Sequence, residues 1–379
     1  MFNSTISFIK EKFDQQAFIP LHEPCFAGNE KEYLLECIDS TFVSSVGKFV
    51  DQFEDKVAKF TKAKFAIATV NGTSALHTAL LLSGVEKNDE VITQALTFIA
   101  TCNAISYIGA HPVFVDVDKA TLGLSAEKLE EFLSANTQVI NGICINKLSK
   151  RKIKAVVPMH TFGFPAQMEE LLAVCKRYSL PIIEDAAESL GSLYKGKHTG
   201  TMGLFGVFSF NGNKTITTGG GGMIVTDDLE LAKKAKHLTT TAKIPHKWDF
   251  VHNQIGYNYR LPNVNAAIGC AQMEMLPKII AKKRALAADY KEYFELQKVN
   301  FVTEQKESLA NYWLNTLILN DVNERNSFLE ETNAQGVMTR PIWKLMNHLP
   351  MFNKAQTDGL ENSKWLEERV VNIPSSVKF

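Results

Sequence analysis

The sequence predicts an α/β protein with a mostly parallel sheet covered by helices on both faces, followed by a smaller α+β domain. Short apolar runs alternate with helical patterns from residue 47 onward, and these runs are continuously apolar, as in strands buried on both faces. The alternation ends near residue 255. We therefore expect a large domain at 1–255 and a small C-terminal domain at 256–379.

The elements of the large domain follow one another in regular order. Segment 47–63 places apolar side chains at helical spacing with charges opposite them, which predicts an amphipathic helix. A strand at 65–70 and a helix at 71–82 come next. Further strands are expected at 90–94, 112–117, 154–159, 181–185, 206–210 and 222–227, and further helices at 98–109, 125–133 and 166–178.

The pattern changes after residue 255. A turn precedes a long helix in which Pro262 is expected at the first turn, where its missing N–H costs nothing. A strand at 310–320, a helix at 323–335 and a strand at 336–343 complete the small domain.

Composition excludes several classes of protein. The 379 residues contain 41 basic and 41 acidic side chains, so the chain lacks the charge of a dedicated nucleic-acid or membrane-surface binder. We expect no membrane span, because no apolar run is long enough, and no metal site, because no metal-binding motif occurs. Six scattered cysteines without a CxxC pair are typical of reduced thiols in a cytoplasmic protein.

Candidate ligand-binding segments stand where strands end, which is where open α/β sheets bind ligands. Residues 71–74 (NGTS) begin a helix, and such an N-terminus can bind a phosphate; a helix cap with a tight glycine turn is the alternative. Asp185 ends an apolar strand, where it can face a ligand or serve a structural role. Ser209 and Lys214 flank a turn, and the glycines at 219–222 permit a close approach to a ligand or form a flexible loop.

The order of these segments is more specific than any of them alone. Gly72-Thr73, Phe98, the EDAAES motif at 184–189, SFNGNK with TTGGGG at 209–222, and GYNYR at 256–260 follow one another. This arrangement resembles the pyridoxal-phosphate-dependent sugar aminotransferases of the DegT/DnrJ/EryC1/StrS family, over nearly the whole chain. The resemblance implies an aspartate aminotransferase-like fold, the fold type I of enzymes that use this cofactor.

The resemblance also implies roles for individual residues. Lys214 would form the Schiff base with pyridoxal phosphate and shuttle the proton, and Asp185 would keep the pyridine nitrogen protonated. Glu188 would contact the ring-hydroxyl side, and Phe98 would stack on the ring. The residues that would hold the phosphate are Gly72, Thr73, Ser74 and Ser209.

Three further residues are implied beyond the cofactor ring. Asn258 would reach the cofactor phosphate of a neighbouring subunit, so the expected assembly is a homodimer with shared active sites; a turn residue is the alternative. His160 and Arg260 would lie on the substrate side, and a satisfied core histidine is the alternative for His160. Lys150, Arg151 and Lys243 are candidates for diphosphate contacts.

The implied reaction is a transamination. L-glutamate would convert the cofactor to pyridoxamine phosphate, which would then aminate the C4 ketone of a nucleotide-linked 4-keto-6-deoxy sugar for surface glycan and lipopolysaccharide biosynthesis. FSFNGNK with TRPIWKLMN most resembles the subgroup acting on UDP-2-acetamido-2,6-dideoxy-xylo-hexos-4-ulose, as UDP-N-acetylbacillosamine-type transaminases do. Alternatives are a dTDP- or GDP-linked ketosugar, a sugar dehydratase, which by resemblance would need His at Lys214, or a non-catalytic nucleotide-sugar binder.

Overall fold

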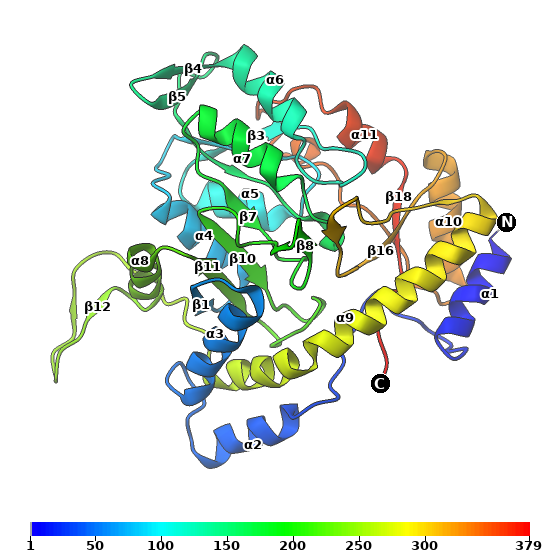
Figure 1. Ribbon diagram of the computed structural model, residues 1–379, viewed down its shortest axis with the longest axis horizontal. Coiled ribbons are helices and arrows are strands. Elements are labelled where there is room, and N and C mark those ends of the chain that lie inside the picture. Colours follow the sequence, from blue (N-terminus) through cyan, green and yellow to red (C-terminus); the bar gives the residue numbers. More distant parts are fainter. Residues whose placement is uncertain (1) are drawn as a thin grey trace.

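The computed structural model describes residues 2–379 and contains a large sheet-centred region and a smaller C-terminal one (Figure 1). Parallel bridges Val156–Ile182 and Met159–Asp185 join a three-stranded and a four-stranded sheet into one continuous layer. Its strands run in the order β3 (His111–Val115), β2 (Glu90–Gln94), β6 (Ile153–Val157), β7 (Ile183–Asp185), β10 (Phe205–Ser209), β11 (Gly222–Thr226) and β1 (Phe65–Thr69). Strand β11 runs antiparallel to both β1 and β10, and the other neighbouring strands of this layer are parallel.

Helices cover both faces of this sheet because successive strand residues point to opposite sides. Val91 packs with one helical layer and Ile92 with the other, and Ile224 lies opposite Val225 in the same way. One layer contains α4 (Gly72–Leu82), α5 (Ile99–Tyr107) and α8 (Leu229–Thr239). The other contains α3 (Lys48–Thr61), α6 (Ala126–Asn136), α7 (Met168–Arg177) and the first part of α9. The expected α/β architecture is confirmed.

A second, antiparallel sheet forms the core of the C-terminal region. Its strands run in the order β14 (Asn300–Phe301), β16 (Asn315–Ile318), β18 (Val370–Ile373) and β17 (Arg340–Pro341). Helices α10 (Val322–Ala334) and α11 (Glu361–Glu367) lie beside it. The strand expected at 336–343 is thus only two residues long in the structure.

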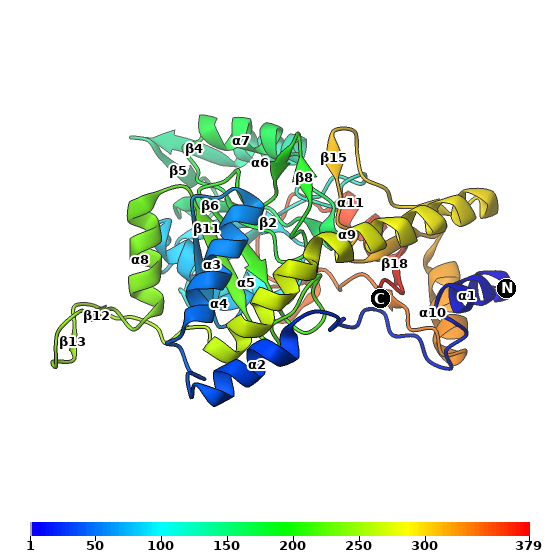
Figure 2. The same cartoon turned by 60° about the horizontal axis from the view of Figure 1, so that its bottom comes forward.

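The long helix α9 (Asn263–Gln297) connects the two regions and has 35 residues (Figure 2). Pro262 is the residue that precedes this helix, one position before the first turn in which it was expected. Asn263 fixes the start: its side-chain amide donates to the Phe42 carbonyl at 2.6 Å, and its side-chain oxygen accepts the N–H of Phe49 at 3.1 Å.

The N-terminal helix α1 (Asn3–Lys12) lies against the C-terminal region and far from the large sheet (Figures 1 and 2). Ile6 and Ile9 belong to the same buried cluster as Tyr290, Phe294 and Phe328. The division into 1–255 and 256–379 stays a proposal, and these contacts associate the first helix with the C-terminal part.

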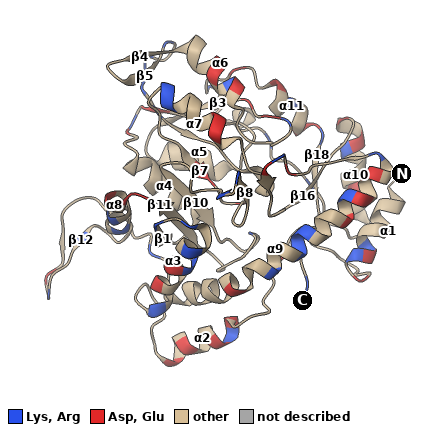
Figure 3. Cartoon of the chain, in the orientation of Figure 1, with Lys and Arg blue, Asp and Glu red and all other residues tan. Residues whose placement is uncertain are grey.

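Several small elements were not expected from the sequence. They are α2 (Glu30–Asp39), the hairpin β4 (Thr137–Ile140) and β5 (Ile143–Asn146), the protruding hairpin β12 (Lys243–Ile244) and β13 (Val251–His252), the strands β8 (Leu193–Tyr194), β9 (Lys197–His198) and β15 (Ser308–Leu309), and the 3-10 turns η1 (Thr161–Gly163) and η2 (Met346–His348). Basic and acidic residues alternate over the same helices, α9 included, so neither sign dominates the molecule (Figure 3). Within residues 2–379, no helix has both the length and the apolar character needed to cross a bilayer.

Candidate active site

A cavity of about 390 Å³ lies where β7 and β10 end and α4 begins. It collects most of the residues that the sequence singled out, from segments more than a hundred residues apart. Its lining consists of Asn71, Gly72, Thr73, Leu76, Phe98, Ala100, Met159, Asp185, Ala187, Glu188, Ser209, Asn211, Asn213, Lys214, Trp313 and Trp343. The carboxyl edge of the sheet is therefore the candidate site.

One end of the cavity is built to accept an anion. The Asn71 side chain caps α4 by accepting the Ser74 N–H at 2.8 Å, while the N–H groups of Gly72 and Thr73 belong to the first turn, whose donors have no intrahelical acceptor. A Cβ on Gly72 would stand 3.0 Å from the Ser209 Cβ, so only glycine leaves this space open. Ser74 itself is buried and does not line the cavity.

The glycine run at 219–222, after Lys214, packs against the same start of α4 through Gly222. A Cβ on Gly222 would lie 2.4 Å from the Asn71 carbonyl carbon and 2.7 Å from the Gly72 nitrogen. The absence of a side chain therefore lets β11 press against the start of α4. The sequence left two alternatives for 219–222, a close approach to a ligand or a flexible loop. Gly222 does make a close approach, but to the backbone of Asn71 and Gly72 and not to a ligand.

Asp185 is a buried carboxylate that faces the cavity. It accepts the Thr101 hydroxyl at 2.7 Å and the Ala187 N–H at 3.2 Å. Burial raises the pKa of Asp185, and these two donors together with Lys214 oppose that rise. No cation of residues 2–379 forms an ion pair with it, so a protonated ring nitrogen would be a fitting partner.

Lys214 and Glu188 form an ion pair across the cavity, with 3.0 Å between Nζ and Oε1. The other Glu188 oxygen accepts the N–H of Phe162 at 2.9 Å. Burial raises the pKa of Glu188 to about 7, although Lys214 and the Phe162 N–H favour the charged form. The lysine is thus held by a carboxylate that can carry or release a proton near neutral pH.

Aromatic side chains form the opposite wall, and the sequence did not point to two of them. Trp343 packs against Phe162 with 4.9 Å between ring centroids and against Phe98 with 6.4 Å. Trp313 lies with its ring centroid 4.0 Å from the Lys214 Nζ. The sequence placed both tryptophans on or beside strands of the C-terminal domain, and no local motif revealed that these segments return to the sheet edge.

Besides Ser74, three more predicted residues lie outside the cavity. His160 is fully buried, its Nε2 lies 3.0 Å from Glu184, and its Nδ1 accepts the Ala166 N–H, so its surroundings match the alternative of a core histidine. Asn258 is exposed and accepts a hydrogen bond from the Arg260 Nε at 2.9 Å. Neither Asn258 nor Arg260 lines the cavity of its own chain.

The basic residues suggested for diphosphate contacts are also elsewhere. Arg151 lines a hollow with Glu90 and His111, where β2 and β3 begin, at the edge of the sheet opposite Lys214. Lys243 lies on the protruding hairpin, over the Phe250 ring.

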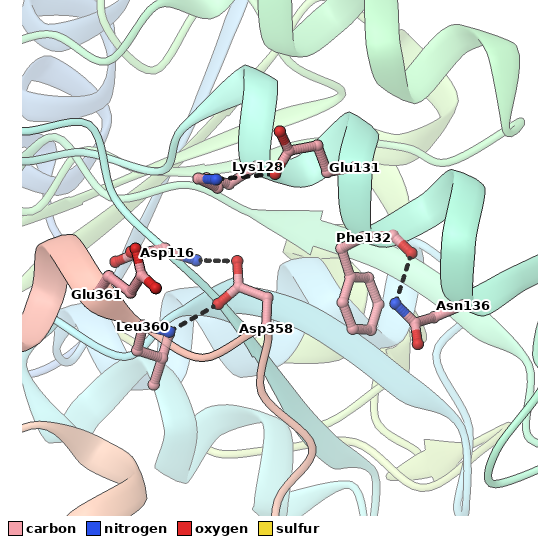
Figure 4. Close-up of a pocket in the computed structure, with 8 residues that line it drawn as sticks. All are labelled: Asp116, Lys128, Glu131, Phe132, Asn136, Asp358, Leu360 and Glu361. Atoms are coloured by element: carbon pink, nitrogen blue, oxygen red, sulfur yellow. Dashed lines mark hydrogen bonds and ion pairs between the residues drawn. The ribbon is translucent and has the colours of Figure 1, made fainter.

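A separate hollow of about 250 Å³ lies between α6 and the segment before α11 (Figure 4). Asp358 accepts the Asp116 N–H there at 2.9 Å, and Lys128 is paired with Glu131. These carboxylates satisfy local backbone and lysine donors. Among the described residues, no group of three or more His, Cys, Asp or Glu side chains could hold a metal ion.

Comparisons with known proteins agree with this geometry. The model of the DegT/DnrJ/EryC1/StrS aminotransferase family matches residues 24–379. GDP-perosamine synthases of Escherichia coli O157:H7 and Caulobacter vibrioides are 38% and 37% identical to this chain, each covering 94% of it and 93% of the relative. PseC of Helicobacter pylori, an aminotransferase involved in pseudoaminic acid biosynthesis, superposes with a TM-score of 0.83 at 25% identity, over 94% of this chain and 93% of that one.

The donor set fits the cofactor of such enzymes. A helix N-terminus suits its phosphate, the buried Asp185 suits its ring nitrogen, and the Lys214 amine suits its aldehyde. The chain belongs to the DegT/DnrJ/EryC1/StrS aminotransferase family and is a pyridoxal-phosphate-dependent sugar aminotransferase of fold type I.

Proposed function

We propose that this enzyme transfers an amino group from L-glutamate to the C4 ketone of UDP-2-acetamido-2,6-dideoxy-xylo-hexos-4-ulose, for surface glycan biosynthesis. The observation that carries the aminotransferase chemistry is the Lys214–Glu188 pair, 3.0 Å long, in one cavity with Asp185 and the start of α4. A non-catalytic binder or a dehydratase would not need this paired lysine.

The chain's own residues divide the work among them. Bound pyridoxal phosphate supplies an electron sink and carries the amino group between substrates as pyridoxamine phosphate. The first N–H groups of α4 and the Ser209 hydroxyl would bind its phosphate, and Asp185 would hold the proton on its ring nitrogen. The Lys214 Nζ would take up and return the proton that moves during transfer, and Glu188 would restrain that Nζ near the ring hydroxyl.

Two candidates for the nucleotide of the substrate have separate support. The resemblance of FSFNGNK and TRPIWKLMN to the subgroup that acts on UDP-linked acetamido sugars supports the first candidate. Three relatives that are 36–38% identical are named GDP-perosamine synthase, which supports a GDP-linked sugar as the second candidate.

A panel of 4-keto-6-deoxy sugars linked to UDP, GDP and dTDP, with glutamate as donor, separates these candidates. Mass spectrometry of the products should show a preference of at least about tenfold for the UDP-linked acetamido sugar. A preference for the GDP- or dTDP-linked sugar would overturn the proposed substrate but not the proposed transamination. No amination of any member would overturn the proposed function.

The proposed working unit is a homodimer with shared sites. Asn258 is exposed and its turn lies beside the strand that leads into α4, since the Tyr259 carbonyl accepts the Val70 N–H at 2.8 Å. Helix α2 and the segment after it also expose an apolar surface that a second copy could cover, made of Leu35, Ile38, Phe42, Val43 and Val46. The six free cysteines support the cytoplasmic location that belongs to this proposal.

Subunit mixing tests the shared site. Lys214→Ala and Asn258→Asp homodimers should both be impaired, the second because a carboxylate repels the phosphate. In a mixed dimer, one site would combine the altered Lys214 position of one subunit with the altered Asn258 position of the other. The second site would keep both native residues, so activity should partly recover. Exchange without recovery would rule out the shared site.

A further inference from the structure

Residues 311–313, which precede β16, contact both neighbours of Lys214. The indole Nε1–H of Trp313 donates to the Asn213 carbonyl at 2.6 Å. The side-chain amide of Asn311 donates to the Thr215 hydroxyl at 3.1 Å. A segment of the C-terminal region therefore holds the lysine-bearing turn immediately before and immediately after the lysine.

Trp313 also contacts the lysine side chain itself. The Lys214 Nζ lies 4.0 Å from the centroid of the indole ring, within the range of a cation–π contact. The same Nζ is 3.0 Å from Glu188, so the amine contacts both a carboxylate and an aromatic face. One tryptophan thus fixes the backbone that carries the lysine and one side of the amine.

The tryptophan is in turn held firmly in place. It is only 4% exposed, and its backbone N–H donates to the Asn311 side-chain oxygen at 2.8 Å. The buried Lys283 of α9 donates to the Trp313 carbonyl at 3.1 Å. The same Asn311 Nδ2 also lies 2.9 and 3.0 Å from the Glu188 and Leu190 carbonyl oxygens, so its two N–H groups are shared among three acceptors that tie Asn311 to the large region.

We propose that Trp313 is a positioning residue for Lys214, which keeps the lysine-bearing turn and the amine in one orientation through its indole N–H and its ring face. The proposal rests on the proposed catalytic role of Lys214. Trp313 would act as a restraint. Without its indole N–H the turn opens more often, and without its ring the Lys214 amine loses its aromatic contact.

Trp313→Phe separates the two contributions, because it keeps an aromatic face and removes the donor. Hydrogen exchange of the cofactor-free protein, followed by mass spectrometry, reports on the turn without any activity. A peptide covering 211–216 should exchange roughly fivefold faster in Trp313→Phe, the effect expected for one lost hydrogen bond. Trp365→Phe, a tryptophan of the same region over the Lys119 amine, should leave this peptide unchanged.

Kinetics give the second readout. In Trp313→Phe we expect kcat for the glutamate half-reaction to fall about tenfold and the KM for glutamate to change less than twofold, because orientation and not binding is lost. Unchanged exchange at 211–216 would overturn the proposal. A rise in the KM for glutamate with kcat unchanged would overturn it too, since that is the pattern of lost substrate binding.

Thr215→Val provides an independent variant should Trp313→Phe fail to fold. It removes the acceptor on the other side of the lysine and keeps the shape of the side chain. Faster exchange at 211–216 supports the restraint, and no change overturns it. Failure of the proposed function would appear differently, as full activity in Lys214→Ala.

Discussion

The two walls of the cavity differ in what they are made of and in where they come from. The polar wall is the edge of the large sheet near the start of α4, where Asp185 and Glu188 are buried and Lys214, partly exposed, is paired with Glu188. The aromatic wall is formed largely by Trp313 and Trp343 from the C-terminal region. This difference teaches that the charged groups of the cavity come from the ends of sheet strands, whereas its large aromatic surfaces come from a second region packed against them.

The largest effect is expected at the lysine of the polar wall. Lys214→Ala should reduce turnover to background, because both the bond to the cofactor and the proton shuttle depend on the one amine. Mass spectrometry of the amino-sugar product measures this loss. Lys306→Ala, an exposed lysine, is the matched control and should be fully active. If Lys214→Ala kept even a tenth of the wild-type rate, the proposed catalytic role of Lys214 would be wrong.

The next effect concerns Asp185. Asp185→Asn keeps the size and removes the charge, so the ring nitrogen loses its partner and the cofactor becomes a poorer electron sink. We expect a loss of at least about a hundredfold in kcat, the size found when one preorganised electrostatic group is removed. Cofactor binding, followed by fluorescence titration, should persist through the phosphate contacts. A near-normal rate would make Asp185 a structural residue.

These two residues illustrate what the sequence could predict. Asp185 and Lys214 follow apolar strands, and strand ends of a parallel sheet meet at one edge, so their proximity follows from topology. Trp313 reaches the site through a segment whose own pattern indicates only a strand. Helix α1 packs on residues near 290 and 328. Its ten residues contain no local pattern from which these distant partners could be predicted.

Individual residue roles were harder to predict than the architecture. His160 ends a strand beside Asp185, yet its ring faces Glu184 inside the core, because a side chain can point to either face of a sheet. Ser74 is one residue beyond the anion-binding turn, and its N–H is already taken by the Asn71 cap. The role of Asn258 depends on a second chain, which no single-chain pattern describes.

A smaller effect should appear in the pH dependence of stability. The folded-state pKa of Glu188 is raised to about 7 from an ordinary value of 4.5, so its contribution is fully present below pH 4.5 and is lost as the pH rises through 7. The free energy of unfolding of the wild type, relative to Glu188→Gln, should therefore fall by about 2 kcal/mol between pH 5.5 and 7.5.

Urea unfolding of the cofactor-free protein at several pH values measures this difference. Glu86→Gln changes an exposed carboxylate and should show no such trend. A wild type that gains stability relative to Glu188→Gln over this range would reverse the sign and show that Glu188 is held in its charged form.

The smallest effect belongs to the aromatic wall. Trp343→Ala removes a ring that lines the cavity and packs on Phe98 and Phe162, so the KM for the sugar nucleotide should rise about tenfold while kcat changes less than threefold. Steady-state kinetics at saturating glutamate give both values. A fall in kcat with an unchanged KM would mean that Trp343 affects the chemical step, as the polar residues are expected to do, and would contradict the proposed difference between the two walls.

The most direct test of the account is the half-reaction with glutamate alone. Enzyme loaded with pyridoxal phosphate and mixed with glutamate, without any sugar nucleotide, should release one 2-oxoglutarate per Lys214 site and then stop, because the amino group remains on the cofactor. Mass spectrometry or a coupled dehydrogenase assay counts the product. No 2-oxoglutarate from the wild type, or an equal yield from Lys214→Ala, would contradict the claim that this sheet edge is an aminotransferase centre.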